Sequence, residues 1–145
     1  LPYFEGERTP NRPNATGVFS GMNIANSNPA DIARAMIEGM LSGLADAVAA
    51  LEDLGVDIKR VLIIGGAAKN PAVCQIASAL FGRPVLIPPA GEYVADGAAK
   101  QAAWALLGGA TPPVWDLGKA THIEAAATPA VLEKYRTLRD ATVNW

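Results

Sequence analysis

The segment RVLIIGGAAKNP, residues 60–71, restricts the fold of this 145-residue chain more than any other part of the sequence. Val61 to Ile64 are four consecutive apolar residues, and such a run predicts a strand buried on both faces of a parallel sheet. Gly65 and Gly66 then permit a sharp turn with a bare main chain. The dipeptide Asn70-Pro71 is typical of a helix N-cap and first helical residue, so we expect a helix to begin there.

Two interpretations of this segment remain open. A strand, a glycine turn and a helix N-terminus at the carboxyl edge of an open sheet form a seat for a nucleotide. The alternative is a tight turn in which glycine serves only to reverse the chain. The segment lacks the G-x-G-x-x-G spacing of NAD modules, and the next expected strand ends in Pro88-Pro89, with no acid to bind that cofactor's ribose. Asn70 follows Lys69 where a P-loop needs Ser or Thr.

The rest of the chain alternates expected strands and helices. Strands are expected over Val18–Ile24 and Pro84–Ile87, beside the one at Val61. The expected helices begin near Pro29, span 71–81 and 93–107, and begin again at the cap Thr128-Pro129. This alternation predicts an α/β fold with a mostly parallel sheet, with an antiparallel pairing of the first strand left open. Residues 110–127 are expected to be irregular.

The long helix near Pro29 carries two informative patterns. Asn28 precedes the proline as an N-cap. Gly39 and Gly43 lie inside the helix, where each glycine costs about 1 kcal/mol relative to alanine, so we expect another element to approach closely there. Apolar residues at helical spacing predict one buried face, formed by Ile32, Met36, Met40, Leu44, Val48 and Leu51. The helix over 93–107 is rich in alanine on several sides, which favours tight packing against a sheet.

Charge and cysteine content limit the partners and the compartment. The net charge of −2 gives no general attraction to nucleic acid or acidic membranes, and no run of about 20 apolar residues predicts a membrane span. The single cysteine, Cys74, is expected to be a small buried hydrophobe in a cytoplasmic protein. The only histidine, His122, is expected at the surface, and His and Cys are too few for a metal site.

The first 16 residues predict a loop, because they hold three prolines and show neither a helical nor a strand period. Within it, Glu7 and Arg8 are candidates to order a substrate or an adjoining domain, and an exposed loop without such a role is the alternative. The chain begins without methionine, which is typical of a piece of a longer polypeptide.

Four sequence patterns resemble the C-terminal domain of the FGGY carbohydrate kinases, most closely their xylulokinase branch. The second FGGY signature is present as Gly17-x-Phe19-x-Gly21-Met22, eight residues, and Asp31-Ile32-x-x-Ala35-Met36-Ile37-Glu38. The loop ahead of it, Leu1-Pro2-Tyr3 with Gly6-Glu7-Arg8-Thr9-Pro10, is similar to the xylulokinase loop. Gly65 to Asn70 resemble the adenosine segment of the family, and Glu92-x-x-Ala95-x-Gly97-Ala98-Ala99 its last core helix.

The resemblance implies a partial ribonuclease H-like module of the actin-like ATPase superfamily. Residues 1–109 would be the nucleotide-side domain without its first strands, and residues 110–145 a tail ending in a helix. By position, Gly66 would pack against adenine or ribose, Asn70 would bond the nucleotide, and Gly65 would allow its close approach. Ala67 adds a methyl group where the family often has a third glycine, and Thr16 replaces a common arginine.

The implied activity is ATP-dependent phosphorylation of D-xylulose to D-xylulose 5-phosphate by the intact protein. Other FGGY kinases, acting on glycerol, gluconate or ribulose, and a non-catalytic α/β interaction module are the alternatives. The resemblance places the catalytic aspartate, the phosphate loops, most of the sugar site and most Mg²⁺ contacts outside this chain. We therefore expect no catalytic residue here, no activity of the isolated chain, and ATP or ADP as its direct ligand. A homodimer is left open.

Overall fold

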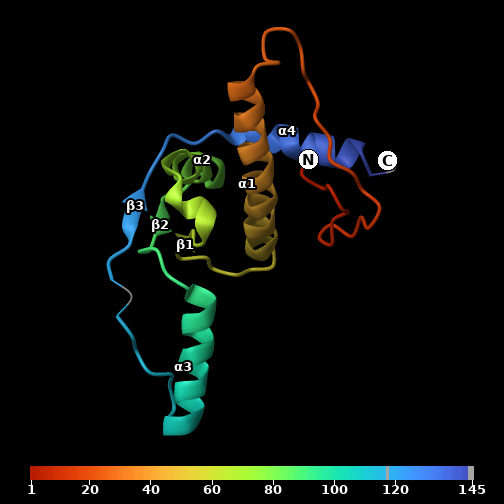
Figure 1. Cartoon of the computed structure of the whole chain (residues 1–145). Coiled ribbons are helices and arrows are strands. Elements are labelled where there is room, and N and C mark those ends of the chain that lie inside the picture. The colour runs from red at the N-terminus through yellow and green to blue at the C-terminus, as the bar shows by residue number, and fades with distance from the viewer. Residues whose placement is uncertain (117, 144–145) are drawn as a thin grey trace.

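The computed structural model describes residues 1–116 and 118–143 of the chain (Figure 1). Its helices and strands, in chain order, are α1 (Pro29–Asp53), β1 (Val61–Leu62), a 3₁₀ turn (Gly66–Lys69), α2 (Pro71–Phe81), β2 (Val85–Ile87), α3 (Tyr93–Leu107), β3 (Thr121–Ile123) and α4 (Pro129–Ala141). All three expected internal helices and the final helix are present.

The sheet has three strands in the order β1-β2-β3. β1 pairs with β2 in parallel, with Val61 opposite Val85, and β3 pairs with β2 antiparallel, with His122 opposite Leu86. Two sequence predictions are wrong here. The segment Val18–Ile24 forms no strand, and the third strand comes from the segment over 110–127 that was expected to be irregular.

These errors share one physical cause, which is that short strands form only where a partner offers its backbone groups. Val18 exchanges backbone bonds only with Leu1, its N–H donating to the Leu1 carbonyl at 3.0 Å. Thr121–Ile123 instead lies along the free edge of β2. His122 is exposed there, as the sequence predicts.

β1 is an edge strand that is buried on one face only, so the prediction of a strand buried on both faces is wrong. Ile63 packs against the core, whereas the alternating residues Leu62 and Ile64 are 45% and 48% exposed. β2 is the only described strand that pairs with β1. The unbroken apolar run therefore marks a surface that this part of the chain does not cover.

The core lies between α1 and α2. Its central cluster is formed by Leu41, Val73, Ile76, Ala77 and Leu80, and Ile37 and Val131 pack against it. The prediction of the buried face of α1 is wrong, because the face that packs inward is shifted by one residue position from the predicted one. Met36, Met40 and Leu44 are 52%, 42% and 56% exposed, while the face through Ile37, Leu41 and Ala45 packs inward.

The helix boundaries mostly follow the sequence signals. The side chains of Asn28 and Asn70 cap α1 and α2, accepting from the N–H groups of Ala30 at 3.1 Å and Ala72 at 2.9 Å. Gly82 ends α2 in the left-handed conformation. Thr128 precedes α4, but its hydroxyl makes no capping bond, so that part of the prediction is wrong. Its N–H instead donates to the carbonyl of Ala79 at 2.9 Å.

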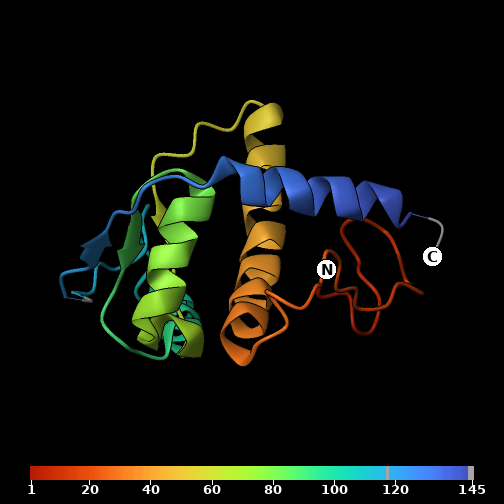
Figure 2. The ribbon, with the colours of Figure 1, turned by 90° about the horizontal axis from the view of Figure 1, so that it is seen from above.

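α4 crosses α1 and continues alongside the N-terminal loop (Figure 2). Gly43 of α1 is where α4 approaches: a Cβ there would lie 3.3 Å from the hydroxyl of Tyr135. The expectation of a close approach is therefore confirmed at Gly43, whereas at Gly39 the nearest atom to a Cβ would be Cδ of Pro2 at 3.9 Å, an ordinary contact.

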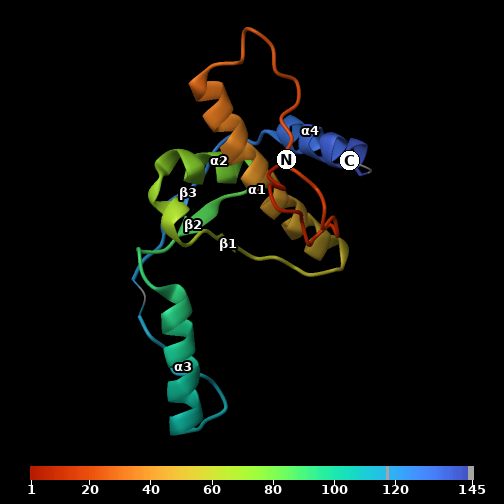
Figure 3. The same ribbon diagram turned by 45° about the vertical axis from the view of Figure 1, so that its right-hand side comes forward.

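α3 extends away from the body of the molecule (Figures 1 and 3), and none of its residues is buried. The prediction that this alanine-rich helix packs tightly against the sheet is wrong for this chain. Small residues on several sides show only that a helix can be approached closely, and its neighbours are decided by tertiary structure. None of the helices described is both long and apolar enough to span a membrane.

Candidate functional site

The turn after β1 has an unusual backbone. Gly65 adopts φ 91° and ψ −173°, a region that is open in practice only to glycine. The 3₁₀ turn Gly66–Lys69 follows directly, and Asn70 then caps α2. The buried thiol of Cys74, on the first turn of α2, donates to the carbonyl of Ala68 at 3.3 Å and so supports the turn from below. Burial raises the pKa of that thiol, against a smaller opposing effect of a hydrogen bond with the backbone of Cys74 itself.

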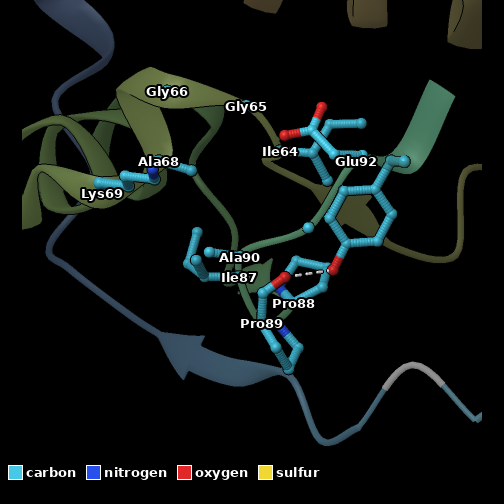
Figure 4. A pocket seen from close by; sticks show the side chains of 12 residues that line it. Ile64, Gly65, Gly66, Ala68, Lys69, Ile87, Pro88, Pro89, Ala90 and Glu92 are labelled. Atoms are coloured by element: carbon cyan, nitrogen blue, oxygen red, sulfur yellow. Dashed lines mark hydrogen bonds between the residues drawn. The ribbon is translucent and has the colours of Figure 1, made fainter. Parts of the chain in front are cut away.

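A hollow of about 680 Å³ opens beside this turn (Figure 4). It is lined by two segments that follow parallel strands, and their residues are Ile64, Gly65, Gly66, Ala68, Lys69, Ile87, Pro88, Pro89, Ala90, Gly91, Glu92 and Tyr93. The volume lies within the range of small-molecule sites, and the position, outside the carboxyl ends of parallel strands, is where open α/β sheets bind ligands.

The structure brings only some of the predicted nucleotide residues to this hollow. Gly65 and Gly66 line it, and no described heavy atom lies within 4 Å of the place that a Gly66 Cβ would occupy. Ala67 and Asn70 do not line it. The Asn70 side-chain oxygen accepts the Ala72 N–H, so a bond from Asn70 to a nucleotide would use the remaining amide group.

Sequence reasoning missed the opposite wall, residues 87–93. Pro88 and Pro89 served only as evidence against NAD, yet they give this wall a rigid apolar surface. A signal was available: β1 and β2 are parallel neighbours, so the segments that follow them must meet at the same edge of the sheet. The Tyr93 hydroxyl donates to the carbonyl of Pro89 and fixes the ring against this wall.

Two charged side chains stand on different sides of the hollow. Figure 4 shows Lys69 with Ala68 on one side and Glu92 with Ile64 on the other. Glu92 occupies the N-cap position of α3 but makes no capping hydrogen bond. Within residues 1–116 and 118–143, no group of three or more His, Cys, Asp or Glu side chains is arranged to hold a metal ion.

The other predicted pair, Glu7 and Arg8, lies far from this hollow. The N-terminal loop and the turn after β1 are on opposite sides of α1 in both Figures 1 and 2. Glu7 is partly buried and its carboxylate accepts the N–H groups of Arg8 and Thr9 at 2.8 and 3.2 Å, while the Arg8 side chain is exposed. The structure thus separates the Glu7–Arg8 pair from the predicted nucleotide residues at Gly65 and does not join them in one site.

A smaller hollow of about 430 Å³ lies on α3, lined by Gln101, Trp104, Ala105 and Gly108. Its walls come from one exposed helix and its C-terminal end, where the Trp104 indole N–H donates to the carbonyl of Gly109 at 2.9 Å. One helix cannot enclose a ligand, so the hollow beside Gly65 is the better candidate site.

Comparisons with known proteins agree with this geometry. Residues 1–106 match the family model described as the FGGY family of carbohydrate kinases, C-terminal domain. The chain is 39% identical over 109 residues to a xylulose kinase of Streptomyces coelicolor, covering 74% of this chain and 22% of that protein. It is 38% identical over 115 residues to a glycerol kinase of Alkalilimnicola ehrlichii, covering 77% of this chain and 23% of that protein.

A solved structure is similar as well. The crystal structure of xylulose kinase from Bifidobacterium adolescentis superposes with a TM-score of 0.79 and 47% sequence identity, covering 95% of this chain and 27% of that one. The fold is accordingly that of the actin-like ATPases, in partial form. Within that class the chain belongs to the FGGY family of carbohydrate kinases and corresponds to the C-terminal domain. It spans about a fifth to a quarter of the length of the relatives it matches.

Proposed function

We propose that this chain is the nucleotide-binding part of an ATP-dependent sugar kinase that, in the intact protein, phosphorylates D-xylulose to D-xylulose 5-phosphate in the cytoplasm. The observation that carries the proposal is the hollow beside Gly65 and Gly66, which combines a bare backbone, apolar walls, and Lys69 on the side away from Glu92. Apolar walls suit the faces of a base, and Lys69 provides a positive charge for a phosphate.

The geometry supports a division of labour between this chain and the rest of the protein. Phosphoryl transfer depends on in-line positioning and on stabilising the charge of the transferred group. The described residues offer a seat for the nucleoside and a lysine near it, but no carboxylate cluster for a metal ion. In the proposed enzyme this chain holds and orients ATP, and the groups that activate the sugar hydroxyl belong to parts outside it.

We propose D-xylulose as the substrate because the chain is similar to xylulose kinases at 39% and 47% identity. A glycerol kinase at 38% identity keeps other FGGY substrates as the second candidate. The sugar contacts expected for the family lie largely outside this chain, so this choice rests on the sequence similarity.

Steady-state assays of ADP formation by the intact protein test the proposal, with ATP and D-xylulose, glycerol, gluconate or D-ribulose. We expect the highest kcat/KM with D-xylulose. A higher kcat/KM with another sugar would favour the second candidate. A well-folded intact protein that shows no ATP binding by calorimetry would instead identify a non-catalytic interaction module.

A further inference from the structure

The hollow beside Gly65 is lined by two side chains of opposite charge. Lys69 belongs to the segment that follows β1, and Glu92 to the segment that follows β2. Figure 4 shows them apart from each other, Glu92 lying close to Ile64. Within residues 1–116 and 118–143 neither side chain takes part in an ion pair. Both charges are therefore available to a ligand in the hollow.

The carboxylate of Glu92 is not used to begin α3. Glu92 occupies the N-cap position, but its side chain makes no capping hydrogen bond. Its backbone carbonyl accepts the N–H of Asp96 at 2.9 Å, so helix initiation uses the main chain of this residue. The side chain is exposed and lines the hollow. Its oxygens can therefore accept hydrogen bonds from a ligand without breaking a described contact of the protein.

The place of Glu92 in the fold suits a ribose. In open α/β folds that bind dinucleotides, an acidic residue near the end of the second strand accepts a hydrogen bond from the ribose. β2 ends at Ile87 and continues into Pro88-Pro89, so the sequence offers no acid directly after this strand. The structure nevertheless brings Glu92 to the hollow, because residues 87–93 line it as one continuous wall. Spacing along the chain alone missed this acid.

The two charges make the sides of the hollow unequal for a nucleotide. Phosphate groups are attracted by Lys69 and repelled by Glu92. Ribose hydroxyls are donors, and a carboxylate is a stronger acceptor for them than a neutral oxygen is. Pro88 and Pro89, on the same wall as Glu92, offer a rigid apolar surface to the nucleoside. This arrangement favours the nucleoside at the Glu92 wall and the phosphates toward Lys69.

We propose that Glu92 recognises the ribose of the nucleotide, its carboxylate accepting hydrogen bonds from the 2′- and 3′-hydroxyls while Lys69 faces the phosphates. This inference rests on the proposed nucleotide binding and adds to it the residue that selects a ribonucleotide. Glu92 is a specificity residue and takes no proton from the sugar that is phosphorylated.

Calorimetry on the intact protein tests this with two ligands, ADP and 2′,3′-dideoxy-ADP, which lacks both ribose hydroxyls. The wild type should bind ADP about tenfold more tightly than the dideoxy nucleotide. Glu92→Ala should bind ADP about tenfold more weakly than the wild type does, and should bind the two nucleotides equally, because the hydroxyls have lost their acceptor. Comparing both ligands in both proteins isolates this one contact.

Asp96→Ala is the matched control. Asp96 also places a carboxylate in the first turn of α3, but it does not line the hollow. The control removes the same charge from the helix N-terminus, so the preference for ADP should be unaltered. An equal loss of preference in Asp96→Ala would overturn the proposal, since the charge at the helix end would then be responsible. A preference that persists in Glu92→Ala would overturn it as well.

Failure of the proposed function is distinguishable from failure of this inference. If the intact wild-type protein binds no ADP, nucleotide binding fails and ribose recognition is refuted with it. If the wild type binds ADP and the dideoxy nucleotide equally well, ribose recognition alone is refuted. Thermal melts of both variants should match the wild type, because neither Glu92 nor Asp96 is buried.

Discussion

Two neighbouring glycines provide a sharp test of the nucleotide site. Gly66 lacks a positive φ, and a Cβ built on it meets no described heavy atom within 4 Å. Gly66→Val should therefore fold normally and place its branched side chain in the space that the nucleotide is proposed to occupy. The lost contact and the clash together correspond to about 1–3 kcal/mol, or roughly a tenfold to hundredfold increase in the KM for ATP.

Gly65→Val is the matched variant, one residue away. At φ 91° and ψ −173° a side chain strains the backbone by about 1–3 kcal/mol, even though no described atom lies within 4 Å of its Cβ position. We expect this variant to lower the melting temperature of the intact enzyme. It should affect both substrates through loss of folded protein.

Thermal melts combined with steady-state kinetics for ATP and for the sugar separate these effects. The expected result for Gly66→Val is an unchanged melting temperature, a raised KM for ATP and a nearly normal KM for the sugar. An unchanged KM for ATP in a folded Gly66→Val enzyme would remove this turn from the nucleotide site. Loss of stability equal to that of Gly65→Val would show that the turn serves only the fold.

Three further predictions follow from the same contacts. Asn70→Ala should lower the free energy of unfolding by about 1 kcal/mol through loss of the α2 cap, measured by urea denaturation. A raised KM for ATP in the variant that is still folded would support a bond from Asn70 to the nucleotide. Burial and the neighbouring Tyr3 hydroxyl raise the pKa of Tyr135, so the free energy of unfolding should fall as the pH rises above about 10, where the unfolded state loses this proton first. The Tyr135→Phe variant should show a shallower fall with pH. An equally steep fall in the variant would contradict a raised pKa at Tyr135. The isolated chain should phosphorylate no sugar in an ADP-release assay, because the family resemblance places the catalytic aspartate and the phosphate loops outside this chain. Any turnover with D-xylulose would refute this.

Local signals in the sequence were sufficient for the helices and the turn. Asn28-Pro29 and Asn70-Pro71 begin helices because the cap oxygen and the proline act on backbone groups only two or three residues away. Gly65 identified the turn for the same reason, since its positive φ is a property of that residue. The four patterns shared with the FGGY family over the first 109 residues can likewise be recognised from the sequence alone.

The sequence alone determined the helix positions, the glycine turn and the family, because these depend on neighbouring residues. Tertiary structure alone decided which face of α1 is buried, that Thr121–Ile123 completes the sheet, and that the wall after β2 forms half of the hollow. It also decided that Tyr135 meets Tyr3 across 132 positions of the chain. Such contacts depend on which surfaces pack together, and hydrophobic burial is non-directional, so local sequence does not specify the partner.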